Sequence, residues 1–414
     1  MISKEKVILL LLTMLNFTHI MDFMILMPLG NYLMPYFDIT SQQFSMLVAA
    51  YTFSAGTSGF TAAFFVDRFD RKKVLLFAYA GFLIGTLCCA VSPAYEILLA
   101  SRILAGLFGG LIGAQVLSIV ADIIPYERRA AAMGMIMAAF SAASVFGVPF
   151  GLYIANIFNW HAPFYFVVIL GVVLVPFLIR FLPKMDSHLY EKNYRRIRPK
   201  ELISDIFKNG SQLYALSLTA CLMLGHFMII PFINPFMEFN MGFSKTQTPL
   251  IYMVGGALTM FTSPLIGRLA DRIGKYNVLI ILILAGVPLI ALITNLPMIP
   301  FYLVLCITGA WFVVSAGRFV PAQAIISDVV PTERRGSFMS FNSSVQQIFV
   351  GLSSVLAGLI VVRMPDNRLE NYEITGYLSI GLILCSIVIA TLLNKNVNKN
   401  NRMVSNEDEL AVAG

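Results

Sequence analysis

The sequence has little charge and no long polar region. Only 12% of its 414 residues are Asp, Glu, Lys or Arg, whereas soluble proteins carry about 25%. The longest polar segment, residues 184–212, is too short for a second folded domain. A Gly-x-x-x-x-Gly-Lys-Ser/Thr phosphate loop is absent, which disfavours ATP hydrolysis by this chain. These absences argue against a soluble protein and against an ATP-driven one.

Cysteine is also scarce, and its positions suit no known cysteine framework. The five cysteines are odd in number, fall within apolar stretches and lack the spacing of metal ligands. We therefore expect packing or lipid-facing roles for them. No Ser/His/Asp set or cluster of metal ligands stands out elsewhere, so we expect no catalytic residues, no metal and no cofactor.

Apolar runs of about twenty residues recur along the whole chain. Each is long enough to cross a hydrocarbon core of about 30 Å as a helix. The runs are continuous rather than alternating at period two, which excludes a transmembrane β-barrel. The sequence therefore predicts an all-α integral membrane protein with twelve transmembrane helices. The predicted spans are residues 7–29, 43–65, 74–92, 96–121, 130–154, 162–182, 211–237, 247–268, 277–295, 299–327, 336–362 and 374–393.

Lysine and arginine are distributed unevenly between the connections. With a cytoplasmic N-terminus, 24 of the 29 lie in cytoplasmic segments and 3 in external loops. The other two, Arg102 and Arg318, lie within spans. The positive-inside rule then predicts a multi-pass protein of the cell membrane with both termini cytoplasmic. The net charge of +7 is a topology signal, and we expect no nucleic-acid partner.

The two halves of the chain share three motifs at a nearly constant offset of about 204 residues, which indicates an internal repeat. The polar connection separates the two copies. The pairs are DFMI (22–25) with HFMI (226–229), FFVDRFDRKK (64–73) with GRLADRIGKY (267–276), and ADIIPYERRA (121–130) with SDVVPTERRG (327–336).

We therefore expect two pseudosymmetric six-helix bundles. The first comprises residues 1–183 and the second residues 211–394. A cytoplasmic linker, 184–210, joins them, and its segment 201–208 has an apolar side that suits an amphipathic helix on the membrane surface. Residues 395–414 are expected to form a cytoplasmic tail.

These motifs resemble those of the major facilitator superfamily. GRLADRIGK resembles the signature of its loop between spans two and three, and LASRILAGLFGG (99–110) resembles its span-four motif with an intramembrane arginine. GVPFG (147–151), GRFVPAQA (317–324) and RGSFMSFNSSVQQ (335–347) look like the bacterial drug/sugar efflux branch. The resemblance implies two six-helix bundles that rock to give alternating access, proton-coupled efflux and no cofactor except a coupling proton.

Asp22 stands in the middle of an apolar run, where a carboxylate costs a few kcal/mol. Asn16, His19 and Asp22 are spaced by three, so they share one helix face. One interpretation is a polar cluster that packs against neighbouring helices. The other is a titrating carboxylate in a central cavity, with His226 of the second repeat facing it. Asp22, His226, His19 and Arg318 are the candidates for proton coupling.

The intramembrane arginines differ in predicted depth. Arg102 lies about two turns from the outer end of its span and can extend outward. Arg318, ten residues before Asp328, falls near mid-bilayer, where it can be a counter-ion of Asp22, a substrate anchor or a structural partner. Neutral polar residues are further candidates, although Gln and Asn also join helices. The candidates for the substrate cavity are Asn16, Tyr51, Arg102, Gln115, Gln323, Asn342 and Gln346.

Glycine and proline mark two further features. Glycines 106, 109, 110 and 113 should let span four approach its neighbours closely. Gly147, Pro149 and Gly151 should deform span five.

Charged clusters follow spans two, four, eight and ten. In the resembling family, these clusters hold the cytoplasmic side closed and separate when the halves rock. The residues that match are Asp67, Arg68, Arg71, Asp122, Arg128, Asp271, Arg272, Asp328 and Arg334.

The sequence thus favours a secondary active transporter for a small organic solute. Efflux by proton antiport is the leading hypothesis, with proton symport and gradient-independent facilitation as alternatives. A membrane-embedded sensor or enzyme is disfavoured because neither a catalytic group nor an extra domain is evident. We expect the lipid bilayer and a small molecule as partners, and a functional monomer.

Overall fold

The computed structural model describes residues 4–124, 126–186, 208–330 and 332–413. Within these ranges, the first half contains eight helices and two short distorted turns. They are α1 (Lys4–Ile25), α2 (Gly30–Tyr36), α3 (Ser41–Phe65), η1 (Val66–Arg68), α4 (Arg71–Ala90), α5 (Tyr95–Ile123), α6 (Tyr126–Ala142), η2 (Ala143–Gly147), α7 (Val148–Ile157) and α8 (Ala162–Phe181).

The second half repeats this plan and adds a small hairpin. Its elements are α10 (Gly210–Phe227), α11 (Ile230–Phe239), α12 (Thr248–Ile273), α13 (Lys275–Thr294), α14 (Phe301–Gly317), α15 (Phe319–Ser327), α16 (Thr332–Ile360), β1 (Val362–Arg363), β2 (Leu369–Glu370) and α17 (Tyr372–Ala413). The two strands pair antiparallel.

The twelve predicted spans correspond to these helices. In the described part of the chain, eleven helical segments are long and apolar enough to cross a membrane. The twelfth is α3, which is less apolar because it is rich in Ser, Thr and Gly, but its 25 residues are sufficient to span the bilayer. The predicted twelve-helix fold is confirmed. The tail expected at 395–414 is a continuation of α17, and most of the linker (187–207), including nearly all of the expected amphipathic segment, lies outside the described residues.

Side-chain caps fix where several helices begin. The Thr40 hydroxyl accepts a hydrogen bond from the Gln43 amide, and the Gln43 side chain accepts one from the Thr40 amide, which is a capping box at the start of α3. At the start of α4, an Asp70 carboxylate oxygen accepts from the amides of Lys72 and Met185. Asp70 therefore joins α4 to the chain that leaves α8.

Four of the predicted spans are broken, and each break lies next to a proline. Pro149 follows the π-helical turn η2, as predicted, because proline cannot donate to the carbonyl four residues earlier. Spans one, seven and ten also break, near Pro28, Pro231 and Pro321. These three spans were expected to be continuous, so their breaks are new.

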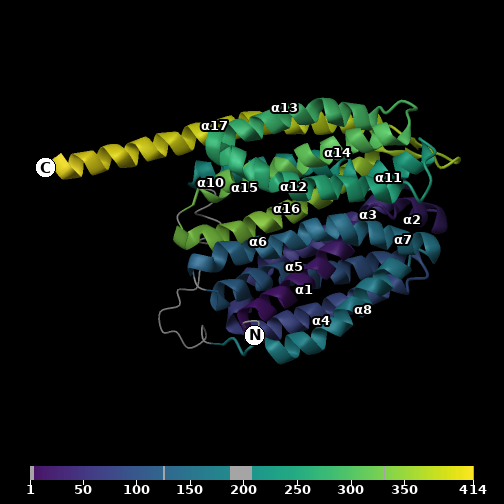
Figure 1. Cartoon of the computed structure of the whole chain (residues 1–414), viewed down its shortest axis with the longest axis horizontal. Helices are drawn as coiled ribbons and strands as arrows, with labels where there is room; N and C mark the ends of the chain where they lie inside the picture. The colour runs from purple at the N-terminus through teal and green to yellow at the C-terminus, as the bar shows by residue number, and fades with distance from the viewer. Residues whose placement is uncertain (1–3, 125, 187–207, 331, 414) are drawn as a thin grey trace.

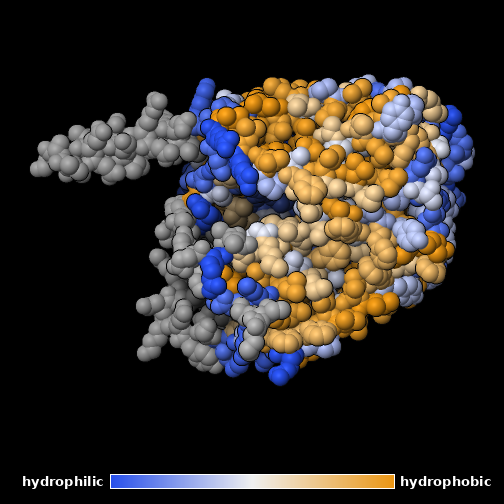
Figure 2. Space-filling model, viewed as in Figure 1, coloured by the Kyte–Doolittle hydropathy of each residue, from blue (hydrophilic) through white to orange (hydrophobic). Residues whose placement is uncertain are grey.

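The two halves lie side by side around a hollow. Figure 1 shows residues from the first half below those of the second, with α3 and α16 among the helices between them. Figure 2 shows an apolar belt between two polar ends, as a membrane protein requires, and a hollow between the halves that opens toward the side where α17 projects. We call that side the terminal face. Glu5 and Arg128 form an ion pair there.

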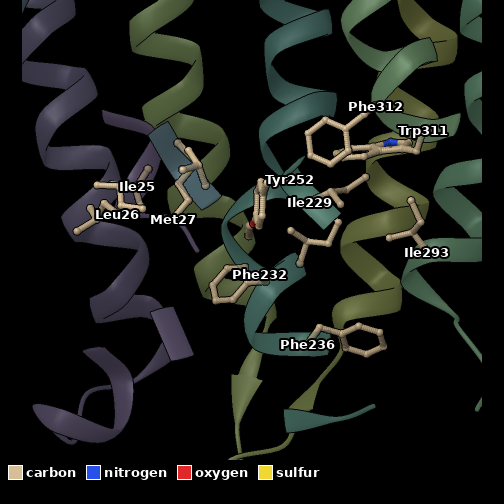
Figure 3. Close-up of a cluster of buried hydrophobic side chains, with 14 of the residues drawn as sticks. Ile25, Leu26, Met27, Ile229, Phe232, Phe236, Tyr252, Ile293, Trp311 and Phe312 are labelled. Carbon is tan, nitrogen blue, oxygen red and sulfur yellow. The ribbon is translucent and has the colours of Figure 1, made fainter. Parts of the chain in front are cut away.

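The opposite side, which we call the closed face (residues 25–40, 228–247 and 361–371), is sealed by apolar side chains. Figure 3 shows Ile25, Leu26 and Met27 of the first half opposite Phe232 and Tyr252 of the second. All are buried and belong to one apolar cluster that spans both halves. The hollow therefore ends at this layer.

Hydrogen bonds between the halves support the same closure. The Asn234 amide donates to the Pro28 carbonyl oxygen at 2.7 Å, and the Asn31 amide donates to the Glu238 carboxylate. The guanidinium of Arg363, in the hairpin, donates to the carbonyl oxygens of Met34 and Ile39, each at 3.0 Å. The hairpin was not predicted from the sequence. Through Arg363 it holds the second half against the first in this conformation.

We expect Arg363→Gln to open the closed face. Hydrogen bonds from a charged donor contribute about 1.5–3 kcal/mol each, so the loss should shift the closed–open equilibrium roughly tenfold or more. Spin labels at position 36, at the end of α2, and at position 298, between α13 and α14, would report a longer distance, and both positions are exposed. Arg368→Gln is the matched control because Arg368 pairs with Asp366 of its own hairpin. Equal distances in both variants would show that Arg363 does not hold the closed face shut.

Candidate transport site

Asp22 and Arg102 form a buried ion pair inside the first half. Arg102 Nη1 lies 2.8 Å from Asp22 Oδ2, and both side chains are fully buried. The expectation that Arg102 extends toward the surface is wrong, because the carboxylate of α1 holds its guanidinium within the bundle. Asp22 is thus neutralised by α5 of its own half and not by Arg318.

Tyr51 and His19 surround this pair. The Arg102 guanidinium lies over the Tyr51 ring, 4.3 Å from its centroid, a cation–π contact. The His19 ring packs against Tyr51 and Phe82. The Tyr51 hydroxyl and both His19 ring nitrogens lack a hydrogen-bond partner among the described residues. Polar atoms that can accept or donate a proton therefore lie beside the ion pair.

Glycines of α5 bring α3 close enough to place Tyr51. A Cβ atom at Gly106 would lie 2.3 Å from the Tyr51 carbonyl oxygen, and one at Gly110 would lie 2.1 Å from the Ala55 carbonyl oxygen. Any larger residue would force the two helices apart. The predicted close approach of span four is confirmed at these two positions but is wrong at Gly113, where a Cβ atom would have no described atom within 4 Å.

The other polar candidates of the first half have structural contacts or none. The Asn16 amide donates to the Ile136 carbonyl oxygen of α6 at 3.2 Å, so it joins two helices. Gln115 is buried, and its side-chain oxygen has no partner in the described structure.

A series of aromatic rings connects the two halves at this depth. Phe23 stacks on Tyr51 at 5.7 Å and lies 6.3 Å from Phe227 of the second half. Phe227 is 5.1 Å from the His226 ring. In the described part of the chain, Asp22 forms its ion pair within the first half rather than with His226. These rings link the surroundings of the two residues.

His226 and Arg318 occupy the corresponding region of the second half. The His226 ring stacks on Trp311 at 5.5 Å and lies 5.5 Å from Phe319. Arg318 is fully buried at the break between α14 and α15, and none of its three side-chain nitrogens has a hydrogen-bond partner among the described residues. Its guanidinium is 5.6 Å from the Phe319 centroid.

The amide candidates of the second half are distributed differently. The Thr219 hydroxyl donates to the Asn342 side-chain oxygen at 2.6 Å, whereas the Asn342 side-chain nitrogen has no partner within the described ranges. Gln323 and Gln346 are half-buried, and the Gln323 oxygen likewise has no described partner.

The charged clusters at the terminal face pair within each half in this conformation. Arg71 lies 2.6 Å from Asp122, and Lys275 lies 2.6 Å from Asp328. Arg335 lies 3.9 Å from Asp328. Arg128 pairs with Glu5. Arg68, Asp271 and Arg272 are exposed, and the side chains of Asp67 and Arg334 lie outside the described residues.

A comparison with protein families agrees with this fold. The family model of the Major Facilitator Superfamily matches residues 12–354. The chain belongs to this superfamily. It is therefore a multi-pass membrane transporter, and its predicted membership of the superfamily is confirmed.

Relatives of this transporter include bacterial proteins of the same type. It is 28% identical over 329 residues to the uncharacterised MFS-type transporter YwfA of Bacillus subtilis, covering 78% of this chain and 75% of that protein. It is 25% identical over 233 residues to the "Probable sugar efflux transporter" of Helicobacter pylori, covering 56% and 58%.

A solved structure shows the same fold over nearly the whole length. It is a bacterial homologue of the human lysosomal transporter Spinster in an inward-facing, unoccupied conformation. The TM-score is 0.78 at 15% identity, with 96% of this chain and 98% of that one covered.

The aromatic residues beside this site were not predicted from the sequence. Trp311 and the phenylalanines at 23 and 227 were not selected, although each lies beside a selected residue in the structure. Phe23 and Phe227 directly follow Asp22 and His226 in the repeated motif. Their recurrence at the same position in both halves was the sequence signal that could have identified them.

Proposed function

We propose that this transporter exports a small organic solute across the cell membrane in exchange for protons, by alternating access between its two halves. The observation that carries the proposal is the ion pair of Asp22 and Arg102, fully buried in the first half. The relative named as a sugar efflux transporter supports the direction of transport.

The ion pair gives the transporter two electrostatic states. With Asp22 ionised, its attraction to Arg102 holds α1 against α5. Protonation of Asp22 removes most of that attraction and leaves a buried cation, which costs about 3–5 kcal/mol in proteins when a buried pair is broken. A change of this size is sufficient to shift a two-state equilibrium about a hundredfold or more. Proton binding at Asp22 therefore biases the conformation of the first half.

The aromatic series provides a physical connection to the second half. A displacement of α1 moves Phe23, which packs beside both Tyr51 and Phe227. Because close-packed groups transmit displacement, the state of the pair affects the contacts between the halves. His19 and Tyr51, whose polar atoms have no partner among the described residues, are the groups through which a proton would reach Asp22.

We further propose that both termini are cytoplasmic, following the distribution of lysine and arginine. The hollow then faces the cytoplasm and the closed face lies outside, which is the conformation in which an exporter loads its solute. No cofactor other than the coupling proton is needed, and one chain contains both halves of the pathway. Symport, in which solute and proton move in the same direction, can use the same ion pair and is the second candidate.

Proteoliposomes with an internal pH dye test the coupling. A panel of apolar amines, amides and carboxylates is applied under an imposed pH gradient. We expect at least one solute to cause proton movement opposite to its own, and to be accumulated against its gradient. Solute and proton movement in the same direction would indicate symport. Transport with no proton movement would overturn the proposal of coupling.

A further inference from the structure

Arg318 is a buried cation without a counter-ion in the described structure. It is fully buried, and its Nε, Nη1 and Nη2 atoms all lack partners there. The guanidinium remains charged because arginine is not deprotonated in proteins, and an unpaired buried charge is strongly unfavourable. Arg102, the other intramembrane arginine, is paired with Asp22. Arg102 therefore has a counter-ion within its own chain, whereas Arg318 has none among the described residues.

The second half offers no carboxylate to Arg318 among its described side chains. Its described acidic side chains lie at the two faces of the molecule. Glu238 accepts from Asn31 and Thr248 at the closed face, and Asp328 pairs with Lys275 at the terminal face. The neutralising group must therefore come from outside the described chain.

Two further buried groups that can donate a hydrogen bond precede Arg318 in the chain. Trp311, Ser315 and Arg318 are spaced by four and three residues, so Trp311 and Ser315 lie on the face of α14 that leads to Arg318 at its C-terminal end. The Trp311 ring nitrogen and the Ser315 hydroxyl are buried and, like the guanidinium, have no partner within the described ranges. Indole and guanidinium groups donate but do not accept, so the ligand that satisfies them must be an acceptor with negative charge.

The groups that surround the guanidinium are small or aromatic. Gly286 of α13 lies beside the guanidinium, since a Cβ atom there would be 4.0 Å from Arg318 Nη1. The rings of His226 and Phe319 pack together next to Arg318 and are half-buried, as is Phe227. The guanidinium therefore has partly accessible aromatic rings beside it.

We propose that the solute is an organic monoanion whose carboxylate binds Arg318, Ser315 and Trp311, with its apolar or aromatic part against His226, Phe227 and Phe319. That this anion is the exported solute rests on the proposed function, whereas its binding does not. Export of an anion in exchange for a proton moves net positive charge inward, so an inside-negative potential drives the cycle.

Thermal unfolding of the purified full-length transporter tests the site without any gradient. The probes are 2-naphthoate, which has both charge and ring, acetate, which lacks the ring, 2-naphthamide, which lacks the charge, and chloride. We expect 2-naphthoate to raise the melting temperature by about 3 °C or more, because a ligand that binds only the folded state stabilises it. Acetate and chloride should have smaller effects and the amide none.

Arg318→Gln gives a two-sided control. Without added ligand it should melt at a higher temperature than the wild type, because an unpaired buried charge has been removed, and it should not respond to 2-naphthoate. A lower melting temperature would show a structural role and overturn the proposal. Arg368→Gln, which removes a surface arginine, should retain the response.

The remaining outcomes decide between ligands and between proposals. A wild-type protein that responds to neither 2-naphthoate nor acetate overturns the anion site. An equal response to chloride shows an inorganic anion site and overturns the organic solute. Asp22→Asn should keep the response to 2-naphthoate, so failure of proton coupling and failure of the anion site are distinguishable.

Discussion

Replacing Asp22 with asparagine should abolish accumulation of the solute against its gradient, while exchange down a gradient continues. Asparagine has nearly the size of protonated aspartic acid and forms similar hydrogen bonds, but it cannot release a proton. Solute flux in proteoliposomes under an imposed pH gradient should therefore fall to the level that equilibrates the two sides. Asp366→Asn is the control, because Asp366 is an exposed carboxylate of the hairpin. Uphill transport at wild-type rates in Asp22→Asn would show that Asp22 serves only in helix packing.

The same change should weaken the fold, for a reason that only the structure provides. Asp22 is the partner of Arg102 at 2.8 Å, so the neutral variant leaves a buried guanidinium unpaired. Breaking a buried pair in this way lowers the free energy of unfolding by about 3–5 kcal/mol. Arg102→Gln in the Asp22→Asn background should restore most of that loss. Coupling must therefore be compared in the double variant as well as the single one.

The sequence was sufficient to predict the membrane architecture. Lipid requires long apolar helices with internally satisfied backbones, and this requirement is visible in the twelve apolar runs. The repeat was visible because DFMI and HFMI recur at corresponding places. The buried position of Asp22 followed from the same runs.

The pairing of the buried charges was not predictable from spacing along single helices. Counting residues placed Arg102 near one surface and Arg318 near the middle, which left Arg318 as one possible partner of Asp22. Which side chains meet depends instead on how α1, α3 and α5 are packed and rotated. Gly106 and Gly110 let α5 approach α3 closely. The position that this packing gives Arg102 relative to Asp22 cannot be derived by counting residues along one helix.

The breaks and the hairpin had sequence signals that were too local to interpret. Pro28, Pro231 and Pro321 each allow a break, but proline in a membrane helix also occurs with only a kink, because neighbouring groups satisfy the freed carbonyl. The segment Pro365–Asn367 is a turn signal, and Asn367 has a positive φ of 69°. Its contact with the first half through Arg363 depends on the closed conformation.

Gly358 should be essential for closing the closed face. It lies on α16 where this helix crosses α3, and a Cβ atom there would be 1.9 Å from the Ser45 hydroxyl oxygen, 2.4 Å from Ser45 Cβ and 3.0 Å from the Ser41 carbonyl oxygen. Rotation of the Ser45 side chain cannot relieve contacts with a Cβ atom and a backbone oxygen. A larger residue must therefore separate α3 from α16.

We expect Gly358→Leu to hold the molecule open at this face and to stop transport. Overpacking of this kind costs about 1–3 kcal/mol or more, and 3 kcal/mol corresponds to a shift of roughly a hundredfold or more away from the closed state. Spin labels at positions 36 and 298 should report the longer distance as the main population, and solute flux should fall to background. Gly381→Leu is the matched control, because Gly381 lies on α17 and a Cβ atom there would have no described atom within 4 Å. If Gly358→Leu keeps the short distance and the wild-type flux, then α3 and α16 adjust without opening, and the crossing at Gly358 does not control access.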